Sequence, residues 1–283
     1  ELSGRFPDIL NDPVVGEVAR PLYDDAQKML KTIVNKKWLE ARAVIGFWPA
    51  NADGDDIVIW KDEKRSAEMA RIPMLRQQMD RRDSGRPNFC LADFLAPASG
   101  PHVDYLGGFA VTAGGGIDNH VAKFEQTHDD YSAILLKALA DRLAEALAER
   151  MHERVRKEFW GYAADERFSN DELIAESYRG IRPAPGYPAS PDHTTKRALF
   201  DLLQAEKNAR IDLTDSYAMM PTAAVSGFYF SHPTAAYFGI GKIERDQVED
   251  YAKRKGMTVA EMERWLAPNL GYNPQALKLE KAS

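Results

Sequence analysis

The residues best suited to bind a charged ligand lie in a proline-rich segment. Residues 180–191 read Gly-Ile-Arg-Pro-Ala-Pro-Gly-Tyr-Pro-Ala-Ser-Pro, with four prolines and two glycines. Because proline lacks an amide donor and has a fixed backbone angle, this composition excludes a helix or a central strand. The segment is therefore predicted to be a loop of fixed shape, and such loops commonly present binding groups.

Arg182 is the only charged residue of this loop. Its planar guanidinium suits a carboxylate or a phosphate. The amides and carbonyls of Ala184 and Gly186 can form hydrogen bonds with the edge of a flat polar ring. A glycine also lets a ligand approach the backbone closely. We therefore expect these three residues to bind a ligand that carries an acidic group.

Two acids and an aromatic pair outside the loop complete the candidate set. Glu145 and Glu176 suit a positively charged ligand, and Tyr237 with Phe238 can supply aromatic faces or edges. A ligand with a carboxylate, an ammonium, a sulfonium and a purine would use all of these groups. Each also has a structural interpretation: Arg182 as an ion-pair partner, Glu145 as a solvated helix charge, and the aromatic pair as core.

Local sequence patterns indicate the elements that must position these groups. Apolar residues at helical spacing predict helices over 12–34, 132–160, 195–205, 246–255 and 259–266, with a shorter one over 170–178 capped by Ser169 or Asn170. Apolar and β-branched runs predict strands over 43–48, 57–60, 86–96, 104–112, 223–230 and 237–240, the first stopped by Pro49. The glycine run at 113–116 fits no phosphate-binding fingerprint and is interpreted as a flexible turn. With no repeat or linker visible, one mixed α+β domain is predicted.

Composition and charge exclude several classes of protein. With 283 residues, of which 44% are apolar, the chain can bury a substantial core. Its formal net charge of −6 argues against nucleic acid as a main partner, because phosphate binding needs a clustered excess of Lys and Arg. The basic runs at 150–157 and 253–255 alternate with acids and are interpreted as solvated helix faces. No stretch of about 18 apolar residues exists, so no membrane span is predicted.

Cys90 is the only cysteine, so no internal disulfide can form and a cytoplasmic location is expected. It lies in the apolar run 89–92, where a buried, inert thiol is predicted. His152-Glu153 begins like a zinc-protease helix but lacks the second histidine four residues after the first, so no metal site is predicted. No pattern of a catalytic base is recognisable, and no catalytic residue is predicted.

Longer strings narrow this interpretation. They are Arg-Pro-Ala-Pro-Gly-Tyr-Pro at 182–188, Val-Ser-Gly-Phe-Tyr-Phe-Ser-His-Pro at 225–233, Arg-Asp-Gln-Val-Glu-Asp-Tyr at 245–251 and Arg-Trp-Leu-Ala-Pro-Asn-Leu-Gly-Tyr at 264–272, with shorter ones at 44–51, 91–94, 128–131, 140–145 and 152–156. Together they resemble the activation domain of cobalamin-dependent methionine synthase. They extend over nearly the whole chain, and their combination is highly specific although any one string is weak.

The resemblance implies a fold and a task. The fold is a single C-shaped α+β domain over residues 1–283, with a twisted antiparallel sheet flanked by helices and S-adenosylmethionine in a shallow groove. The task belongs to a methyltransferase that makes methionine from homocysteine and 5-methyltetrahydrofolate. When the cobalamin of that enzyme oxidises to cob(II)alamin, this domain caps the cobalamin-binding domain. Flavodoxin or an equivalent donor then supplies an electron, and S-adenosylmethionine remethylates the cobalt.

The resemblance also assigns ligand contacts. Arg182 matches the family arginine that holds the ligand carboxylate, and Ala184 and Gly186 match positions whose backbone contacts the ligand. Glu145 and Glu176 fall on acids that line the cationic side of the site.

Four further residues are carried over from the family. Tyr237 and Phe238 fall on an aromatic pair at the adenosyl end, where the family often has two tyrosines. Tyr187 and His193 belong to the surface that would face the corrin. Since Phe238 has no hydroxyl, a hydroxyl-dependent contact is not expected at that position.

An acidic residue in an Asp-Trp-Thr-Pro-type motif also grips the ligand's amino group in the family, upstream of where this sequence starts. The N-terminal edge is therefore expected to be truncated and the affinity reduced. The chain is expected to bind and aim its ligand but not to turn over alone, because the nucleophile belongs to the cobalamin. Two alternatives remain: a capping module that has lost ligand binding, and a stand-alone S-adenosylmethionine enzyme.

Overall fold

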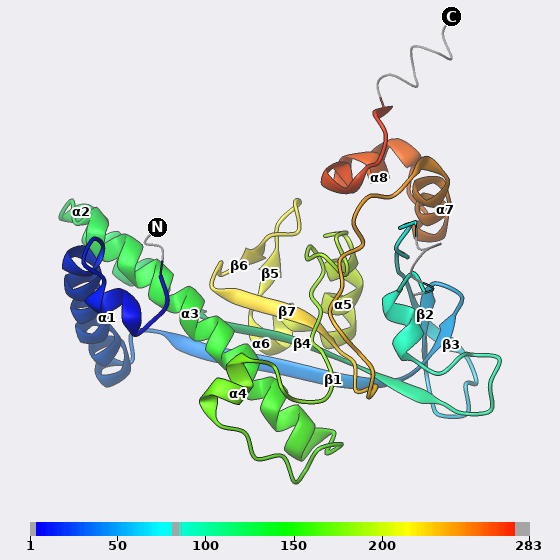
Figure 1. Ribbon diagram of the computed structural model, residues 1–283, viewed down its shortest axis with the longest axis horizontal. Coiled ribbons are helices and arrows are strands. Elements are labelled where there is room, and N and C mark those ends of the chain that lie inside the picture. Colours follow the sequence, from blue (N-terminus) through cyan, green and yellow to red (C-terminus); the bar gives the residue numbers. More distant parts are fainter. Residues whose placement is uncertain (1–3, 81–84, 86, 275–283) are drawn as a thin grey trace, which may run out of the picture. The chain divides into compact units, whose positions relative to one another are not determined.

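A computed structural model describes residues 4–80, 85 and 87–274 of the chain. These residues form eight α-helices and a five-stranded antiparallel sheet, so the predicted α+β class is confirmed (Figure 1). The strand order of the sheet is β3-β2-β1-β4-β7. The strands of this sheet are β1 (Glu40–Asp53), β2 (Asp56–Trp60), β3 (Glu68–Pro73), β4 (Asp104–Gly115) and β7 (Ala224–Tyr229). Strands β5 (Asp212–Leu213) and β6 (Met219–Met220) form a separate two-stranded sheet.

The helices agree well with the apolar periodicity of the sequence. They are α1 (Gly16–Lys36), α2 (Ile117–Gln126), α3 (Asp130–Arg154), α4 (Asn170–Ile174), α5 (Thr195–Leu203), α6 (Ala205–Ala209), α7 (Arg245–Lys255) and α8 (Val259–Trp265). A π-helical turn, Val155–Phe159, continues α3. Ser169 caps α4, as predicted, but that helix ends earlier than expected. Among the described helices, none combines the length and apolar character needed to cross a bilayer.

The chain divides into two compact units. The first consists of residues 1–42, 111–149 and 219–225. Its core packs apolar side chains of α1, α2 and α3 together, namely Ile33, Ile117, Val121, Ala133, Leu136 and Ala140, with Ala223 beside them. The second unit consists of residues 43–110, 150–218 and 226–283, and it contains the proline-rich segment. The predicted single C-shaped domain stays a prediction.

The glycine run in the first unit is not the flexible turn that was predicted. β4 continues through Gly115, and a Cβ atom on Gly114 would lie 2.6 Å from the Cβ of Pro221. A Cβ on Gly115 would lie 2.9 Å from the backbone of Glu40. Gly116, with φ of 82°, caps α2 in a left-handed conformation. Close backbone approach and a helix cap therefore explain these glycines.

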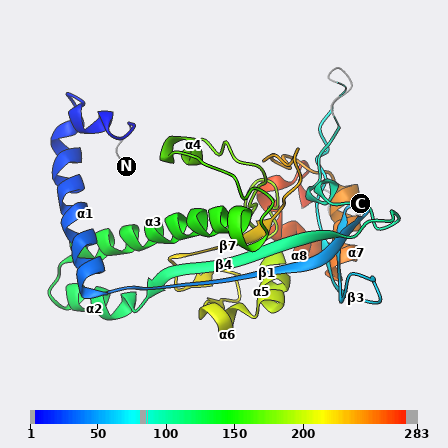
Figure 2. The same ribbon diagram turned by 90° about the horizontal axis from the view of Figure 1, so that it is seen from below.

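In the second unit, helices cover the sheet and its end. Helix α5 lies next to the sheet (Figure 2). It packs on β4, where a Cβ on Gly108 would collide with the Leu199 side chain. Helices α7 and α8 pack on each other, and α7 contacts β3 (Figure 1). Their shared core contains Leu75, Ile240, Ile243, Val248, Tyr251, Ala252, Met262, Leu266 and Leu270.

Pro49 does not stop the first strand, contrary to prediction. β1 runs to Asp53, and its ladder with β2 starts only at Ala50, which pairs with Ile59. Pro49 therefore lies just outside the ladder with β2, where its missing N–H removes no hydrogen bond to that strand.

Two other predicted strands are wrong. Within the described part of 86–96, residues Leu91–Phe94 form a 3₁₀ turn, in which the Asp93 carboxylate accepts a hydrogen bond from the Cys90 N–H. At 237–240 the backbone bonds to a loop, because the Ile240 N–H donates to the carbonyl of Pro188. Apolar content alone does not distinguish such segments from strands.

Cys90 itself fulfils its prediction. The thiol is fully buried and forms no disulfide. Burial raises the pKa of Cys90 to about 12, so the reactive thiolate is suppressed.

Candidate functional site

The proline-rich loop (residues 180–191) starts as an extension of the sheet. Ile181 and Phe230 exchange backbone hydrogen bonds of 3.0 Å each, just after the end of β7. The Phe228 N–H donates to the carbonyl of Pro183 at 2.9 Å. These bonds fix the first residues of the loop to the end of a strand whose last four residues are buried.

The middle of the loop is a tight turn that requires glycine. The Gly186 N–H donates to the carbonyl of Ser190 at 2.7 Å, and the Tyr187 N–H donates to the carbonyl of Ala184 at 3.2 Å. Gly186 has a φ of 95°, and a Cβ atom there would overlap the imidazole of His193. The predicted fixed shape thus rests on hydrogen bonds and close packing as well as on proline.

Arg182 is held at three points. Its backbone N–H donates to the Tyr237 hydroxyl at 3.0 Å. Its Nη1 donates to the Tyr178 hydroxyl at 2.5 Å and lies 3.4 Å from Nδ1 of His152. Two side chains therefore orient the half-buried guanidinium, and a third fixes the backbone of Arg182.

Tyr178 rests in turn on a buried ion pair. Arg156 is fully buried, its guanidinium carbon lies 3.7 Å from the centre of the Tyr178 ring, and its Nη2 lies 2.7 Å from the Glu166 carboxylate. The interpretation of Arg156 as part of a solvated helix face is therefore wrong. Its guanidinium supports the ring of Tyr178 by a cation–π contact, and the hydroxyl of Tyr178 contacts Arg182.

His152 is the second support of Arg182. Its ring is fully buried, stacks on Tyr229 with centroids 5.1 Å apart, and meets Tyr178 edge-on. Burial, reinforced by the positive charges of Arg156 and Arg182, holds the pKa of His152 well below its ordinary value. The imidazole is therefore neutral at physiological pH.

Asp192, the residue that follows the loop, anchors its other end. Its buried carboxylate lies 2.9 Å from Nζ of Lys255 and accepts hydrogen bonds from the Tyr251 hydroxyl and from the N–H and hydroxyl of Thr194. Burial raises the pKa of Asp192, but the attraction of Lys255 and the bonds from Thr194 outweigh it, so the pKa is lowered. This carboxylate is ionised and saturated with donors.

The aromatic pair after β7 divides between two environments. Tyr237 is 45% exposed beside Arg182, to which its hydroxyl is bonded. Phe238 is half-buried, with its ring centre 5.8 Å from that of Phe89 and 6.3 Å from that of Phe94. Tyr237 therefore presents an aromatic surface next to the loop, and Phe238 packs inward.

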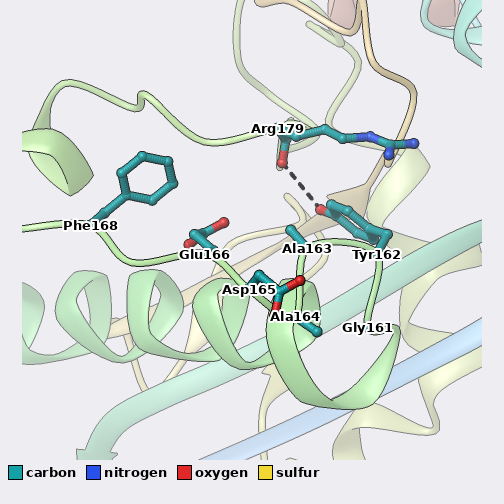
Figure 3. Close-up of a pocket in the computed structure, with 8 residues that line it drawn as sticks. All are labelled: Gly161, Tyr162, Ala163, Ala164, Asp165, Glu166, Phe168 and Arg179. Atoms are coloured by element: carbon teal, nitrogen blue, oxygen red, sulfur yellow. Dashed lines mark hydrogen bonds between the residues drawn. The ribbon is translucent and has the colours of Figure 1, made fainter.

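A pocket of about 450 Å³ lies next to this framework. Figure 3 shows its lining, with the Arg179 side chain above Tyr162, whose hydroxyl donates to the Arg179 carbonyl at 3.4 Å. Arg179 also donates to the carbonyl of Ser231, and the lining residue Glu166 holds Arg156. Tyr162, Arg179 and Glu166 thus all bond to protein groups around the pocket.

Comparison with known proteins then decides the family. Residues 1–256 match the family described as "Vitamin B12 dependent methionine synthase, activation domain". The chain belongs to this family. A solved structure of the MetH reactivation domain bound to AdoHcy is 55% identical to this activation domain, with a TM-score of 0.92. The match covers 96% of this chain and 83% of that chain, and the resemblance inferred from the motifs is confirmed.

Of the residues predicted to bind a ligand, the activation domain brings five into one neighbourhood. Arg182, Ala184, Gly186 and Tyr187 share the proline-rich loop, and Tyr237 bonds to its backbone. Tyr187 is 61% exposed at the turn. Whether each contacts the ligand stays a prediction.

The two predicted acids are placed differently. Glu176 is exposed, follows α4 in a left-handed conformation with φ of 52°, and stands two residues before Tyr178. Glu145 is an exposed residue of α3 in the first unit. Its assignment to the ligand stays a prediction.

Sequence reasoning missed the supports beneath Arg182. His152 and Arg156 are four residues apart and so share one helical face, which was a usable signal. Tyr178 and Glu166 carried no such signal, because their partners are distant in sequence. Within the described residues, no three His, Cys, Asp or Glu side chains gather as they would around a metal ion.

Proposed function

We propose that this activation domain binds S-adenosylmethionine through the proline-rich loop, with Arg182 holding the carboxylate of the ligand. The observation that carries the proposal is the likeness, at 55% identity and a TM-score of 0.92, to a reactivation domain bound to AdoHcy. AdoHcy is S-adenosylmethionine without its transferable methyl group, so a site for one has the groups needed for the other.

The side chains on and beside the loop fit such a ligand. Arg182 offers a guanidinium for the carboxylate, and exposed Glu176 offers a negative charge for the ammonium or sulfonium. Tyr237 offers an aromatic face to the adenosyl group. Because the Gly186 N–H is used within the turn, we propose that the backbone contacts are made by the carbonyl of Gly186 and the amide of Ala184.

We further propose that the loop faces the cobalamin-binding domain of the same enzyme. Tyr187 supports this, because a 61% exposed aromatic ring on a stiff turn is suited to a partner surface. S-adenosylmethionine supplies a methyl group on sulfonium. The residues of this chain bind and aim that group, and the acceptor lies on the other domain, reduced by flavodoxin or an equivalent electron donor.

Calorimetric titration of the chain with S-adenosylmethionine tests the ligand assignment. Replacing Arg182 by alanine removes a charged hydrogen-bond donor, and we expect binding about 10- to 100-fold weaker. Arg179→Ala is the matched control, because it removes an arginine three residues away whose guanidinium lies over Tyr162. Equal affinities of Arg182→Ala and wild type would contradict the assignment. No heat with the wild-type chain would favour a capping module without ligand binding.

Transfer of labelled methyl groups tests the partner. We expect transfer only when the chain, the cobalamin-binding domain and a reductant are combined, and a slower rate with Tyr187→Ala. A methylated small molecule formed without the cobalamin-binding domain would instead favour a stand-alone enzyme.

A further inference from the structure

We propose that His152 is a positioning residue for Arg182, whose guanidinium it orients toward the ligand carboxylate from the buried side. The proposal rests on the proposed function of Arg182 as the carboxylate anchor. His152 is fully buried, so it acts through Arg182 and does not touch the ligand.

The contact between the two side chains has a defined polarity. Nη1 of Arg182 lies 3.4 Å from Nδ1 of His152, and a guanidinium can only donate. Nδ1 is therefore the acceptor, and the ring proton is on Nε2. This tautomer is set by the arginine.

Both hydrogens of the Arg182 Nη1 are used on the protein side. One points to His152, and the other is donated to the Tyr178 hydroxyl at 2.5 Å. Two acceptors on one nitrogen fix the rotation of the planar group, which a single acceptor would leave less defined.

An unsatisfied atom shows that His152 is not there for packing alone. Within the described residues, its buried Nε2 has no hydrogen-bond partner. A buried donor without an acceptor is unfavourable, and a phenyl ring would make the same stack on Tyr229 without that loss. The acceptor at Nδ1 accounts for an imidazole at this place.

The charges around His152 favour the same role. Arg156 and Arg182 both lie near the ring, and burial together with these charges lowers the pKa of His152. A neutral imidazole accepts a hydrogen bond from the guanidinium of Arg182 and repels neither that group nor the guanidinium of Arg156. A lysine or a protonated histidine would push Arg182 out of its position.

The test compares two ligands and three variants. His152→Phe keeps an aromatic ring but removes the acceptor, and His152→Asn restores an oxygen near the position of Nδ1. Tyr178→Phe removes the other acceptor. AdoHcy carries the carboxylate that Arg182 binds, whereas 5′-methylthioadenosine lacks it. We expect His152→Phe to bind AdoHcy about tenfold more weakly, with 5′-methylthioadenosine unaffected and His152→Asn closer to wild type.

A double-mutant cycle separates this proposal from the one on which it rests. If Arg182→Ala leaves the affinity for AdoHcy unchanged, the proposed function of Arg182 fails. If Arg182→Ala weakens binding but His152→Phe does not, the positioning role fails alone. Equal weakening for both ligands, or an undiminished effect of His152→Phe in the Arg182→Ala background, would show a general structural role and overturn it.

Thermal unfolding of every variant checks that it folds. Should His152→Phe not fold, His152→Asn and Tyr178→Phe answer the same question with AdoHcy. A selective loss of AdoHcy affinity in Tyr178→Phe, with binding retained in His152→Asn, supports orientation by acceptors. Wild-type affinity in Tyr178→Phe, or loss of both ligands in His152→Asn, contradicts it.

Discussion

The two ends of the proline-rich loop are anchored by different electrostatics. At the second end, the buried carboxylate of Asp192 is surrounded by the donors of Lys255, Tyr251 and Thr194. At the first end, the guanidinium of Arg182 is held by the Tyr178 hydroxyl and the neutral imidazole next to it.

This difference separates fixing the loop from presenting a charge. The carboxylate of Asp192 already accepts from an ammonium and from several hydroxyl and amide donors, so its role is to hold the loop in place. The guanidinium of Arg182, in contrast, donates to a neutral hydroxyl and lies against a neutral imidazole. At the first end, the buried ion pair is that of Arg156 and Glu166, which lies beneath Tyr178.

Breaking the buried ion pair of Arg156 and Glu166 should have the largest effect on the free energy of unfolding. Glu166→Gln replaces the carboxylate to which fully buried Arg156 donates, and an arginine cannot lose its proton in response. We expect a loss of about 3 kcal/mol or more in the free energy of unfolding, measured by urea denaturation.

The matched control for Glu166→Gln is Asp201→Asn. Asp201 also pairs with an arginine, but its side chain is 65% exposed. Its loss should cost less than about 1 kcal/mol. Similar values for the two variants would contradict the view that the first end rests on a buried charge.

Neutralising the buried carboxylate of Asp192, at the second end, should lower the free energy of unfolding by less than Glu166→Gln does. Asp192→Asn removes the charged partner of Lys255, which is half-buried whereas Arg156 is fully buried, so we expect a loss of about 2 kcal/mol in the free energy of unfolding. Because the pKa of Asp192 is lowered by folding, its contribution is complete above the ordinary value of 3.8. It is lost as the pH falls through the lower pKa of the folded state.

Urea denaturation of wild type and Asp192→Asn over a pH series measures this contribution. The difference in unfolding free energy should be constant near neutral pH and shrink in acid. A difference that grows toward acid would mean that the carboxylate is not ionised in the folded protein.

The smallest loss of unfolding free energy is expected for a substitution in the turn between the two ends of the loop. Gly186→Ala adds a Cβ that overlaps His193 and imposes a φ of 95° on a residue that disfavours it. We expect a loss of about 1–2 kcal/mol in unfolding free energy, with weaker binding of S-adenosylmethionine. In Gly241→Ala, φ is also positive at 72° but nothing lies within 4 Å of the added atom. Equal costs for both would show that the His193 contact does not hold the turn.

Local patterns predicted the elements whose formation depends on nearby residues. Helices α1, α3, α7 and α8, strand β7 and the fixed loop all follow from periodicity or from proline content. Predictions failed where a partner distant in sequence decided the outcome. Pro49 lies in β1 one residue before the ladder with β2 begins, and Gly114 and Gly115 are packed tightly against Pro221 and Glu40.

The sequence by itself determined the family, the α+β class, and the grouping of Arg182, Ala184, Gly186 and Tyr187, because these depend on contiguous residues. Only the tertiary structure decided that Tyr237 bonds to the loop and that a neutral histidine and a tyrosine hold the guanidinium. It also decided that Arg156, which local charge pattern assigns to solvent, is buried against Glu166. Burial and charge pairing are set by what folds against a residue, and that information is spread over segments that the sequence does not place next to one another.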